Sequence, residues 1–450
     1  MHDKLIEIYN AAIAAVDPYR VVLGKVGVAG GRLHVADAEY DLGGYGRILV
    51  VGAGKATARM ALALEELLGE RISAGLVIVK DGHTEALSSI EQVEAAHPVP
   101  DARGLDATAR MLQMVQAADA HTLVICLLSG GASALMVKPA NAMTLQDLQQ
   151  TTELLLSSGA TIGELNAVRK HLSSIKGGGL SKAAYPADVL TLVLSDVIGD
   201  RLDVIASGPT VADSTTFAEA MHVIEKYGLK PRMPLSVVQY LSRGVAGEVP
   251  ETAKAGDASL LKTRNIVIGS LRQALVAAEV AARQLGFDTE LLTAELHGEA
   301  RNAARLLAQA AKQARCTLHG RRCCFLSGGE TTVSVRGHGK GGRNQELALA
   351  FALEVEGMED VFLLAAGTDG SDGPTDAAGA MVHGKTATHA RRLGIEPVHY
   401  LENCDSYNFF KNLDALSGSG SHFITGPTGT NVMDIQIILV GGRGKERPVK

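Results

Sequence analysis

The cluster Gly341-Gly342-Arg343-Asn344-Gln345-Glu346 opens a strongly helical run and places one cation among amide and acid side chains. The first turn of a helix leaves backbone N–H groups unpaired, and these groups, with the positive end of the helix dipole, favour phosphate or carboxylate. Arg343 can add a bidentate guanidinium fork. The pattern predicts an anion site at this helix start. Because similar motifs occur elsewhere in the chain, the sequence also predicts an enzyme that binds phosphate groups.

A glycine turn near the N-terminus offers a second anion site. Residues 50–56 are typical of strand, turn and helix, in which Gly52 and Gly54 permit close backbone approach and Lys55 stands in the first turn. The motif is neither a Walker A loop nor GxGxxG, because Leu49 and Thr57 occupy positions that those motifs reserve for glycine. A phosphoryl or carboxylate group at Lys55 is one interpretation, and a tight turn with a solvated lysine is the other.

Hydroxyl groups and glycines follow the apolar run 122–128. Ser129, Gly130, Gly131 and Ser133 stand at the C-terminal end of the expected strand, where open α/β sheets bind ligands. The spacing differs from the GxSxG pattern of a nucleophile elbow. We therefore predict an oxyanion or phosphate cradle, with an ordinary connecting loop as the alternative.

Cations gather between residues 166 and 179. Asn166-Ala167-Val168-Arg169-Lys170-His171, followed by Lys176 and three glycines, places three to four cations within about three helical turns. Arg169 and Lys176 are candidate ligands for an anionic substrate. A solvated basic helix face is the alternative.

Carboxylates follow two further strand candidates. Asp196 comes after the run 190–194 and before Ser207-Gly208, where a carboxylate could act as a general base, hold Mg²⁺ or cap the next segment. The stretch 367–376 carries Asp369 and Asp372 among glycines without the EF-hand spacing. A magnesium–nucleotide loop and a plain cluster of turns are the two interpretations of that stretch.

Short apolar runs alternate with Ala- and Leu-rich helical stretches along the chain. The expected strands are 47–51, 76–80, 122–128, 190–194, 265–268, 323–326, 361–365 and 434–440. One expected helix begins near residue 56, and the others span 106–117, 145–157, 274–285 and 345–355. Such alternation predicts mostly parallel sheets covered on both faces. The fold class is therefore α/β.

The length of 450 residues suits two or three domains. Between residues 227 and 264 the periodicity weakens at Pro231, Pro234 and Pro250 and in the polar stretch 251–259. We expect one domain over residues 1–245 and a second over 260–450. The amphipathic first residues suit a docking helix better than a signal peptide.

Composition excludes several classes of protein. The net charge of −6, the absence of Trp and the 4% aromatic content argue against a nucleic-acid surface of basic patches and stacking rings. Five cysteines without a CxxC pair predict neither a disulfide framework nor a zinc site, which favours the cytoplasm. No apolar run approaches the roughly 20 residues that span a bilayer.

Several of these motifs together resemble the glycerate 2-kinase family. Those at 51–56, 97–101, 128–133, 166–171, 176–178, 194–197 and 207–210 match the order and spacing of its N-terminal domain. Those at 327–331, 342–346 and 367–373 are similar to its C-terminal MOFRL domain, which we expect at about 322–440. The resemblance covers nearly the whole chain. It implies a larger Rossmann-like N-terminal domain with a mostly parallel sheet, a smaller C-terminal α/β domain, and an active site in the cleft between them.

The resemblance also implies roles for individual residues. The lysine of the GAGK motif, the aspartate after the LVLSD strand and the arginine of GGRNQE correspond to Lys55, Asp196 and Arg343, which we expect to be catalytic. Expected substrate- or phosphate-binding residues are Gly52, Gly54, Ser129, Gly130, Gly131, Ser133, Arg169, Lys176, Ser207 and Gly208. Expected nucleotide-binding residues are Ser327, Gly328, Gly329, Glu330, Asn344, Asp369 and Asp372, with Asp196 and Asp369 as metal candidates.

Family members are ATP-dependent kinases that make 2-phosphoglycerate from D-glycerate. The resemblance therefore implies ATP and Mg²⁺ as cofactors and a small-molecule substrate, without nucleic-acid or membrane partners, and with a homodimer as one option. An NAD(P)H-dependent hydroxypyruvate reductase stays open as an alternative, since some members carry that name, although the motif at Gly52 lacks the third glycine of a dinucleotide site. A non-catalytic sensor of sugar acids or nucleotides is the third possibility.

Overall fold

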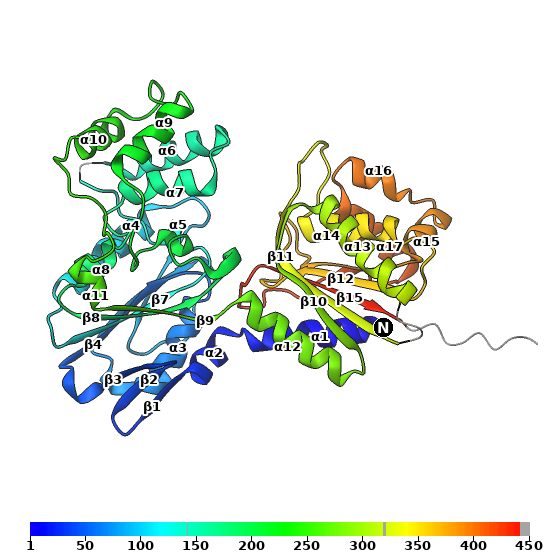
Figure 1. Ribbon diagram of the computed structural model, residues 1–450, viewed down its shortest axis with the longest axis horizontal. Helices are drawn as coiled ribbons and strands as arrows, with labels where there is room; N and C mark the ends of the chain where they lie inside the picture. The colour runs from blue at the N-terminus through cyan, green and yellow to red at the C-terminus, as the bar shows by residue number, and fades with distance from the viewer. Residues whose placement is uncertain (142, 318–320, 442–450) are drawn as a thin grey trace, which may run out of the picture. The chain divides into compact units, whose positions relative to one another are not determined.

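The computed structural model describes residues 1–141, 143–317 and 321–441, and the chain divides into two compact units. The parallel-sheet unit comprises Pro18–Gly269, and the mixed-sheet unit comprises Met1–Asp17 with Ser270–Lys450. Each unit is a sheet covered by helices, so the α/β fold class is confirmed (Figure 1).

The parallel-sheet unit is built on six parallel strands in the order β6-β5-β4-β7-β8-β9. Their bounds are β4 Arg47–Ala53, β5 Ala74–Lys80, β6 Glu91–Ala95, β7 Thr122–Leu128, β8 Asp188–Leu194 and β9 Thr263–Gly269. From β4 the chain builds outward to β5 and β6 on one side, and then from β7 to β9 on the other. This is the strand order of a Rossmann fold, whose ligands bind where the order reverses. Here the reversal lies between β4 and β7.

Helices and a small second sheet complete this unit. The helices are α2 Pro18–Lys25, α3 Thr57–Leu68, α4 Ala102–Gln116, α5 Ala132–Leu135, α6 Leu145–Ser157, α7 Ile162–His171, α8 Gly179–Ala184, α9 Phe217–Lys226, α10 Leu235–Val245 and α11 Ala258–Leu261. Strands β1 Val26–Ala29, β2 Arg32–Val35 and β3 Ala38–Asp41 form an antiparallel sheet. Helices α6, α7, α9 and α10 gather into a separate helical layer with its own hydrophobic core (Figure 1). This layer carries the basic segment of α7.

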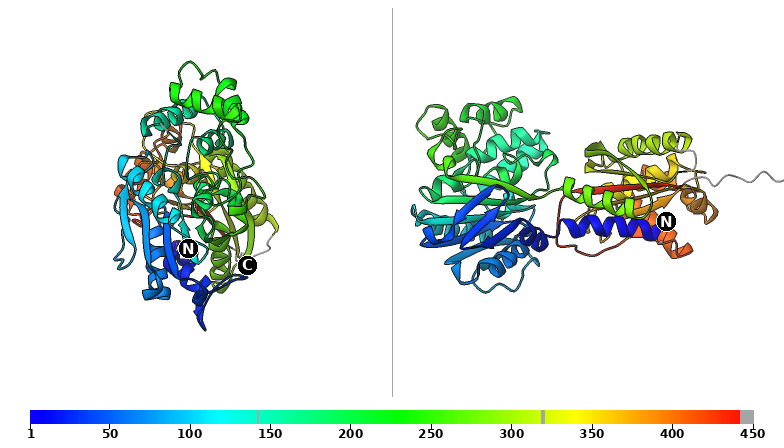
Figure 2. Two further views of the ribbon diagram at one scale, coloured as in Figure 1. Left: turned by 90° about the vertical axis from the view of Figure 1, so that its left-hand side faces the viewer. Right: turned by 60° about the horizontal axis from the view of Figure 1, so that its bottom comes forward.

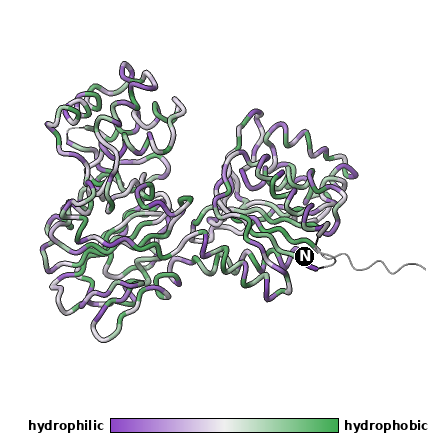
Figure 3. Tube along the Cα trace, in the orientation of Figure 1, coloured by the Kyte–Doolittle hydropathy of each residue, from purple (hydrophilic) through white to green (hydrophobic). Residues whose placement is uncertain are grey.

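The central strands form because their apolar runs can be buried on both faces. All seven residues of β7 are buried, and hydrophobic residues follow the strands of both sheets in Figure 3. Close strand pairing also explains two glycines. A Cβ on Gly52 would lie 2.1 Å from the carbonyl oxygen of Leu127, and one on Gly54 would lie 2.1 Å from Oγ of Ser129. Both glycines are therefore required by the neighbouring strand and the loop that follows it.

Gly52→Ala is expected to destabilise the protein by about 2 kcal/mol or more, because the new methyl group collides with backbone atoms that cannot rotate away. Gly24→Ala is the matched control, since nothing lies within 4 Å of a Cβ at that helical position. Helix propensity should make the control neutral or stabilising by up to about 1 kcal/mol. Urea unfolding of both variants checks the difference, and equal midpoints would contradict this explanation of Gly52.

The mixed-sheet unit contains six strands in the order β10-β11-β15-β12-β13-β14. The strands are β10 Asp288–Glu299, β11 Cys323–Thr332, β12 Val361–Gly367, β13 Gly379–His383, β14 His422–Phe423 and β15 Asp434–Val440. Only β10 and β11 pair in parallel, so the expectation of a mostly parallel arrangement is wrong for this sheet. The reason is that β15 inserts antiparallel between β11 and β12, while β12 reaches β13 without a crossover helix.

Helices cover both faces of the mixed sheet. They are α1 His2–Ala15, α12 Leu271–Gln284, α13 Ala300–Thr317, α14 Arg343–Glu354, α15 Thr386–Arg392, α16 Pro397–Glu402 and α17 Ser406–Ser417. Helix α1 lies against α12 (Figure 2), and it buries Leu5, Ile8, Tyr9 and Ala12. The Tyr9 hydroxyl donates to the carbonyl oxygen of Gly367 over 2.8 Å. The expected docking helix is therefore confirmed.

The observed division of the chain differs from the expected domains of 1–245 and 260–450. The first 17 residues belong with the C-terminal part, and the parallel-sheet unit continues to Gly269. The Pro-rich and polar segment after residue 227 forms α10, α11 and β9. Part of it is tied down by hydrogen bonds from Ala253 N to Gly177 O (3.0 Å) and from Asp213 N to Ala253 O (2.8 Å). Its weak periodicity reflects a segment that wraps the domain and supplies its last strand.

Across the described ranges, no helix combines the length and apolar character needed to cross a membrane.

Candidate active site

Three of the expected segments meet at the carboxyl edge of the parallel sheet. Strands β4, β7 and β8 are neighbours, with Ala53 opposite Leu128 and Leu128 opposite Val193. Lys55, the loop 129–133 and Asp196 follow the ends of these three strands. The edge between β4 and β7 is also the point of topological reversal, where open α/β sheets bind their ligands.

The backbone amides around Lys55 are already paired within the protein. The Lys55 N–H donates to Gly130 O over 2.9 Å, and the Ala56 N–H donates to Ser129 Oγ over 3.1 Å. The Ser129 hydroxyl also contacts Thr57 Oγ1 at 3.1 Å. The expected phosphate cradle of amides at Gly52–Ala56 is therefore occupied by the neighbouring loop, and Ser129 holds the start of α3.

His97, from the motif at 97–101, lies beside Lys55. A Cβ on Gly131 would sit 3.0 Å from His97 Cδ2 and 3.5 Å from Lys55 Cγ, which places the two side chains on the same glycine. Burial, and then the charge of Lys55, lower the pKa of His97 to about 4. His97 is therefore a neutral imidazole at neutral pH.

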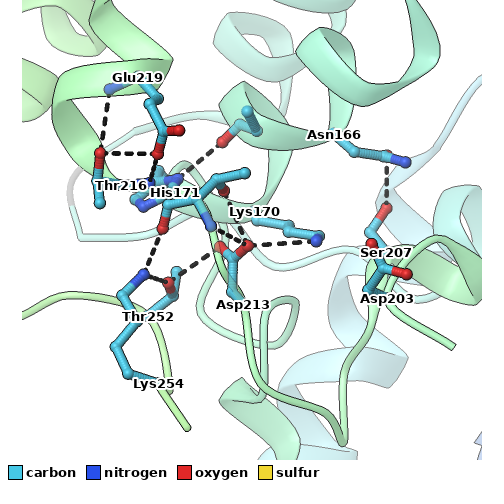
Figure 4. Close-up of polar contacts among 12 residues, drawn as sticks. Asn166, Lys170, His171, Asp203, Ser207, Asp213, Thr216, Glu219, Thr252 and Lys254 are labelled. Atoms are coloured by element: carbon cyan, nitrogen blue, oxygen red, sulfur yellow. Dashed lines mark hydrogen bonds and ion pairs between the residues drawn. The ribbon is translucent and has the colours of Figure 1, made fainter.

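A second cluster joins residues from the loop after β7, from α7 and from the segment after Asp196. Lys176 Nζ donates to the backbone oxygen and to Oγ of Ser133, over 2.7 and 3.0 Å. The Ser133 and Ser207 hydroxyls lie 2.9 Å apart, and Ser207 donates to Asn166 Oδ1 over 3.1 Å (Figure 4). The structure thus brings together Ser133, Lys176 and Ser207, which were expected to bind an anion. Ser133 also stands two residues after Gly131, so one short loop serves both clusters.

Arg169 and Lys176 are the two cations of this second cluster. Burial lowers the pKa of both, and Arg169 lowers that of Lys176 further, to about 7. Within the described residues, neither side chain makes an ion pair with a carboxylate. Two desolvated cations without a counter-ion are costly unless an anion neutralises them. The pair is therefore suited to bind a carboxylate or phosphate.

The other cations of the same segment are structural. Lys170 Nζ lies 3.3 Å from Asp213 Oδ1, and both side chains are buried. Asp213 also accepts from Thr252 Oγ1 over 3.0 Å (Figure 4), and His171 Nε2 lies 2.9 Å from Glu251 Oε2. The interpretation of 166–179 as a solvated basic face is therefore wrong for these residues. Lys170 is neutralised by Asp213, and Asp213 and Glu251 both come from segments after α8.

Arg343 is engaged by the protein's own carboxylates. Its Nε and Nη2 donate to the two oxygens of Asp434 over 2.6 and 2.9 Å, and its Nη1 lies 3.0 Å from Glu330 Oε1. Asp434 is fully buried. Although burial alone would lower the pKa of Arg343, the Asp434 carboxylate holds it above its usual value. The bidentate fork that the sequence suggested for a ligand is therefore directed at Asp434.

The start of α14 is likewise occupied from within. Asp372 accepts from the amides of Asn344 and Gln345 over 3.0 and 2.9 Å, and from the Gln345 side-chain amide over 3.0 Å. Burial raises the pKa of Asp372 to about 6, against the lowering effect of these hydrogen bonds. The expected anion at this helix start is thus the Asp372 carboxylate, which explains why the site needs no external anion.

The motif Ser327-Gly328-Gly329 lies inside β11 and is not a loop. Ser327 is fully buried and donates to Gln436 Oε1 over 3.0 Å. A Cβ on Gly329 would meet Leu296 O at 2.1 Å, and one on Gly328 would meet Leu271 Cδ1 at 2.7 Å. These residues serve strand packing, so the expectation that they contact a nucleotide has no support in this geometry.

Asp369 follows β12 and approaches Asp434. A Cβ on Gly367 would lie 3.4 Å from Asp369 Oδ1 and 3.5 Å from Asp434 Oδ1. The Ser371 amide and hydroxyl both donate to Asp369 Oδ1 over 3.0 Å. The described part of the chain contains no group of three or more side chains arranged to hold a metal ion. Asp369 can still provide one oxygen to a metal that brings its other ligands with it.

A cavity of about 480 Å³ opens beside the start of α14. Its walls include Glu330, Gly342, Arg343 and Glu346 from the expected motifs. They also include Thr331 and Pro374 from those motifs, and residues that the sequence did not single out, namely Val333, Val335, Cys404 and Ser406. No local pattern marks these residues, because they come from separate segments of the chain.

Comparison with known proteins identifies the family. A model for a domain of unknown function, DUF4147, matches residues 4–242, and the MOFRL family model matches residues 323–434. The D-glycerate 2-kinase of Thermotoga maritima is 44% identical over 397 residues, which cover 88% of this chain and 91% of that protein. A protein of Agrobacterium vitis with the provisional name hydroxypyruvate reductase is 41% identical over 438 residues, 96% of this chain and 93% of that protein.

A solved structure supports the same assignment. The crystal structure of a glycerate kinase from Thermotoga maritima matches with a TM-score of 0.85 at 41% identity and covers 97% of this chain and 99% of that one. From the two domain matches and these likenesses over most of its length, the chain belongs to the glycerate 2-kinase family and is an enzyme of the phosphotransferase class.

Proposed function

We propose that the protein is a kinase that uses ATP and Mg²⁺ to transfer the γ-phosphoryl group to the 2-hydroxyl of D-glycerate. The observation that supports this most is the pair of half-buried Arg169 and buried Lys176, neither of which has a carboxylate partner in the described structure. A small hydroxy acid can supply the missing carboxylate. The adjacent hydroxyls of Ser133 and Ser207 offer hydrogen bonds to its oxygens.

Lys55 and Asp196 have suitable positions for the transfer itself. Phosphoryl transfer is promoted mainly by positioning and by cations that offset charge on the phosphoryl oxygens, a role for Lys55 beside neutral His97. Asp196, at the end of β8, can accept the proton of the attacking hydroxyl. Lys55 follows β4 and Asp196 follows β8. The loop that contains Ser133 follows β7 at the same edge of the sheet.

The residues of the mixed-sheet unit fit a magnesium ion that arrives with the nucleotide. Mg²⁺ prefers oxygen ligands and is usually bound through one or two carboxylates together with phosphate oxygens and water. Asp369 supplies such a carboxylate, next to Asp434. When bound, the ion neutralises phosphate charge.

A hydroxypyruvate reductase is the second candidate, because the strand order is that of a dinucleotide-binding fold and one relative carries that name. In that fold the pyrophosphate rests on amides of the first βα turn. Here those amides donate to Gly130 and Ser129. The kinase is therefore favoured.

A coupled assay separates these possibilities and tests two residues. We expect ADP and 2-phosphoglycerate from ATP and D-glycerate, and no NADH oxidation with hydroxypyruvate. A non-catalytic sensor would instead bind its ligand without turnover. Lys55→Ala and Asp196→Asn should each lower kcat/KM by about 10²-fold or more, because each group acts on the reacting atoms. Lys25→Ala is the control, at the end of α2. Near-normal turnover of either variant would remove that residue from the proposed site.

The pKa of Lys176 predicts how substrate binding depends on pH. In the free protein the amine is protonated below its pKa of about 7 and neutral above it, so attraction for a carboxylate should weaken as pH rises through 7. A bound carboxylate favours the protonated amine, so binding at pH 8 should take up a proton. Calorimetry in buffers of different ionisation enthalpy measures that uptake. A Kd for D-glycerate that stays constant between pH 6 and 8.5 would contradict the assignment of Lys176.

A further inference from the structure

The cavity of about 480 Å³ in the mixed-sheet unit contains two hydroxyl groups with unused hydrogen-bonding capacity. Thr331 Oγ1 and Ser406 Oγ belong to nearly or fully buried residues of its wall, and neither finds a hydrogen-bond partner within the described structure. Buried hydroxyls without a partner are costly and uncommon. Ser406 Oγ would lie 2.3 Å from a Cβ on Gly341, another wall residue, so the hydroxyl faces the wall position where that glycine leaves room.

The charges around the cavity do not favour an anion. Arg343 is neutralised by Asp434 and Glu330, and Glu346 is bound by Arg301 Nε over 2.7 Å. Three carboxylates therefore face two guanidinium groups, which leaves one negative charge in excess. Among the described residues that line the cavity, the Arg or Lys side chain is that of Arg343, which is already paired with carboxylates. The cavity consequently suits a ligand part that is neutral and carries its own hydrogen-bond donors.

Shape and surface narrow the class of ligand further. The volume lies in the range of sites for drug-sized molecules and is far larger than a three-carbon acid needs. Val333, Val335 and Pro374 supply apolar wall, and the glycines of the wall expose backbone. A flat ring with exocyclic donors, joined to a sugar with hydroxyl groups, uses both kinds of surface.

We propose that this cavity binds the nucleoside part of the phosphoryl donor, with Thr331 and Ser406 as specificity-determining contacts. This inference rests on the proposed function, since it assigns one half of the donor to the mixed-sheet unit. The phosphates lie outside the cavity, because its charge disfavours them.

The absence of Trp from the natural sequence provides a direct test. Val335 is 72% exposed on the cavity wall, so Val335→Trp would introduce the only indole of the protein. Leu416→Trp is the matched control, because Leu416 is 61% exposed on α17 and does not line the cavity. We expect adenosine to change the emission of Val335→Trp saturably, ATP to compete, and Leu416→Trp to respond to neither.

Enzyme kinetics provide the second arm. Thr331→Val and Ser406→Ala remove one hydroxyl each with little change in volume, and each should raise KM for ATP by about fivefold while KM for D-glycerate stays unchanged. Unchanged KM for ATP in both variants, or a Val335→Trp signal that follows D-glycerate and not adenosine, would overturn the inference. If glycerate is not phosphorylated at all but adenosine still changes the Trp emission, the proposed function fails and the nucleoside cavity stands.

Discussion

Lys176→Met is expected to lower kcat/KM for D-glycerate by about 10²-fold while the protein stays as stable as the parent or becomes more stable. The loss of activity follows from the proposed role of the buried amine, which is to donate a charge-assisted hydrogen bond to the substrate carboxylate, since such a contact in a desolvated site is strong. Stability is retained because the loss of the two hydrogen bonds to Ser133 is offset by relief of the burial that penalises the Lys176 charge and lowers its pKa to about 7. Methionine fills similar space without that penalty.

Lys170→Met is the matched comparison, six residues away and equally buried. Lys170 forms an ion pair with Asp213, and its removal leaves a buried carboxylate without its cation. This variant should lose about 3–5 kcal/mol of stability. Steady-state kinetics and thermal unfolding of the two variants, side by side, check the contrast. If Lys176→Met binds D-glycerate normally, or if it unfolds as readily as Lys170→Met, the substrate role of Lys176 is wrong.

Arg343→Ala is expected to destabilise the mixed-sheet unit by about 3–5 kcal/mol, because it leaves the fully buried Asp434 carboxylate without its bidentate cationic partner. Turnover should fall as well, so an activity assay alone would misassign the residue as purely catalytic. The measurement is chemical unfolding of the variant, followed through a probe in the mixed-sheet unit. Unfolding at the midpoint of the parent would contradict the structural account.

A double variant separates the two roles of Arg343. Arg343→Ala combined with Asp434→Asn also removes the buried negative charge of Asp434, and it should recover part of the lost stability. If turnover returns together with stability, the arginine acts by holding the fold. If stability returns and turnover remains about 10²-fold low, Arg343 also acts on the phosphoryl group, as the resemblance implied.

Most strands of the parallel sheet were predictable from local pattern. The run 122–128 is continuous and apolar, and β7 has those bounds because all its residues are buried. Strand β10 was missed, since Asp288–Glu299 lies at the edge of its sheet and only one of its residues is buried, so no apolar pattern is required there. The place of α1 could not be predicted either, because an amphipathic helix specifies an apolar partner but not which one.

For the candidate site, too, the sequence predicted the local elements but not the contacts between them. Chain order correctly placed Lys55, the loop from Ser129 to Ser133 and Asp196 after strands, and parallel pairing then brought them to one edge. Which glycine amides remained available was not predictable, since Gly130 and Ser129 reach them from another strand. The strand expected over 323–326 is longer than predicted, because β11 continues through the motif at Ser327 to Thr332.

The sequence by itself determined the α/β class, the Rossmann-like order of elements and the chemical types of the side chains at the sheet edge. The tertiary structure decided which charges are already neutralised. Lys170 and Arg343 find Asp213 and Asp434, 43 and 91 residues further along the chain, whereas Arg169 and Lys176 find no carboxylate within the described residues. Ion pairing depends on distances of a few ångströms in a desolvated interior, and only packing of remote segments sets those distances.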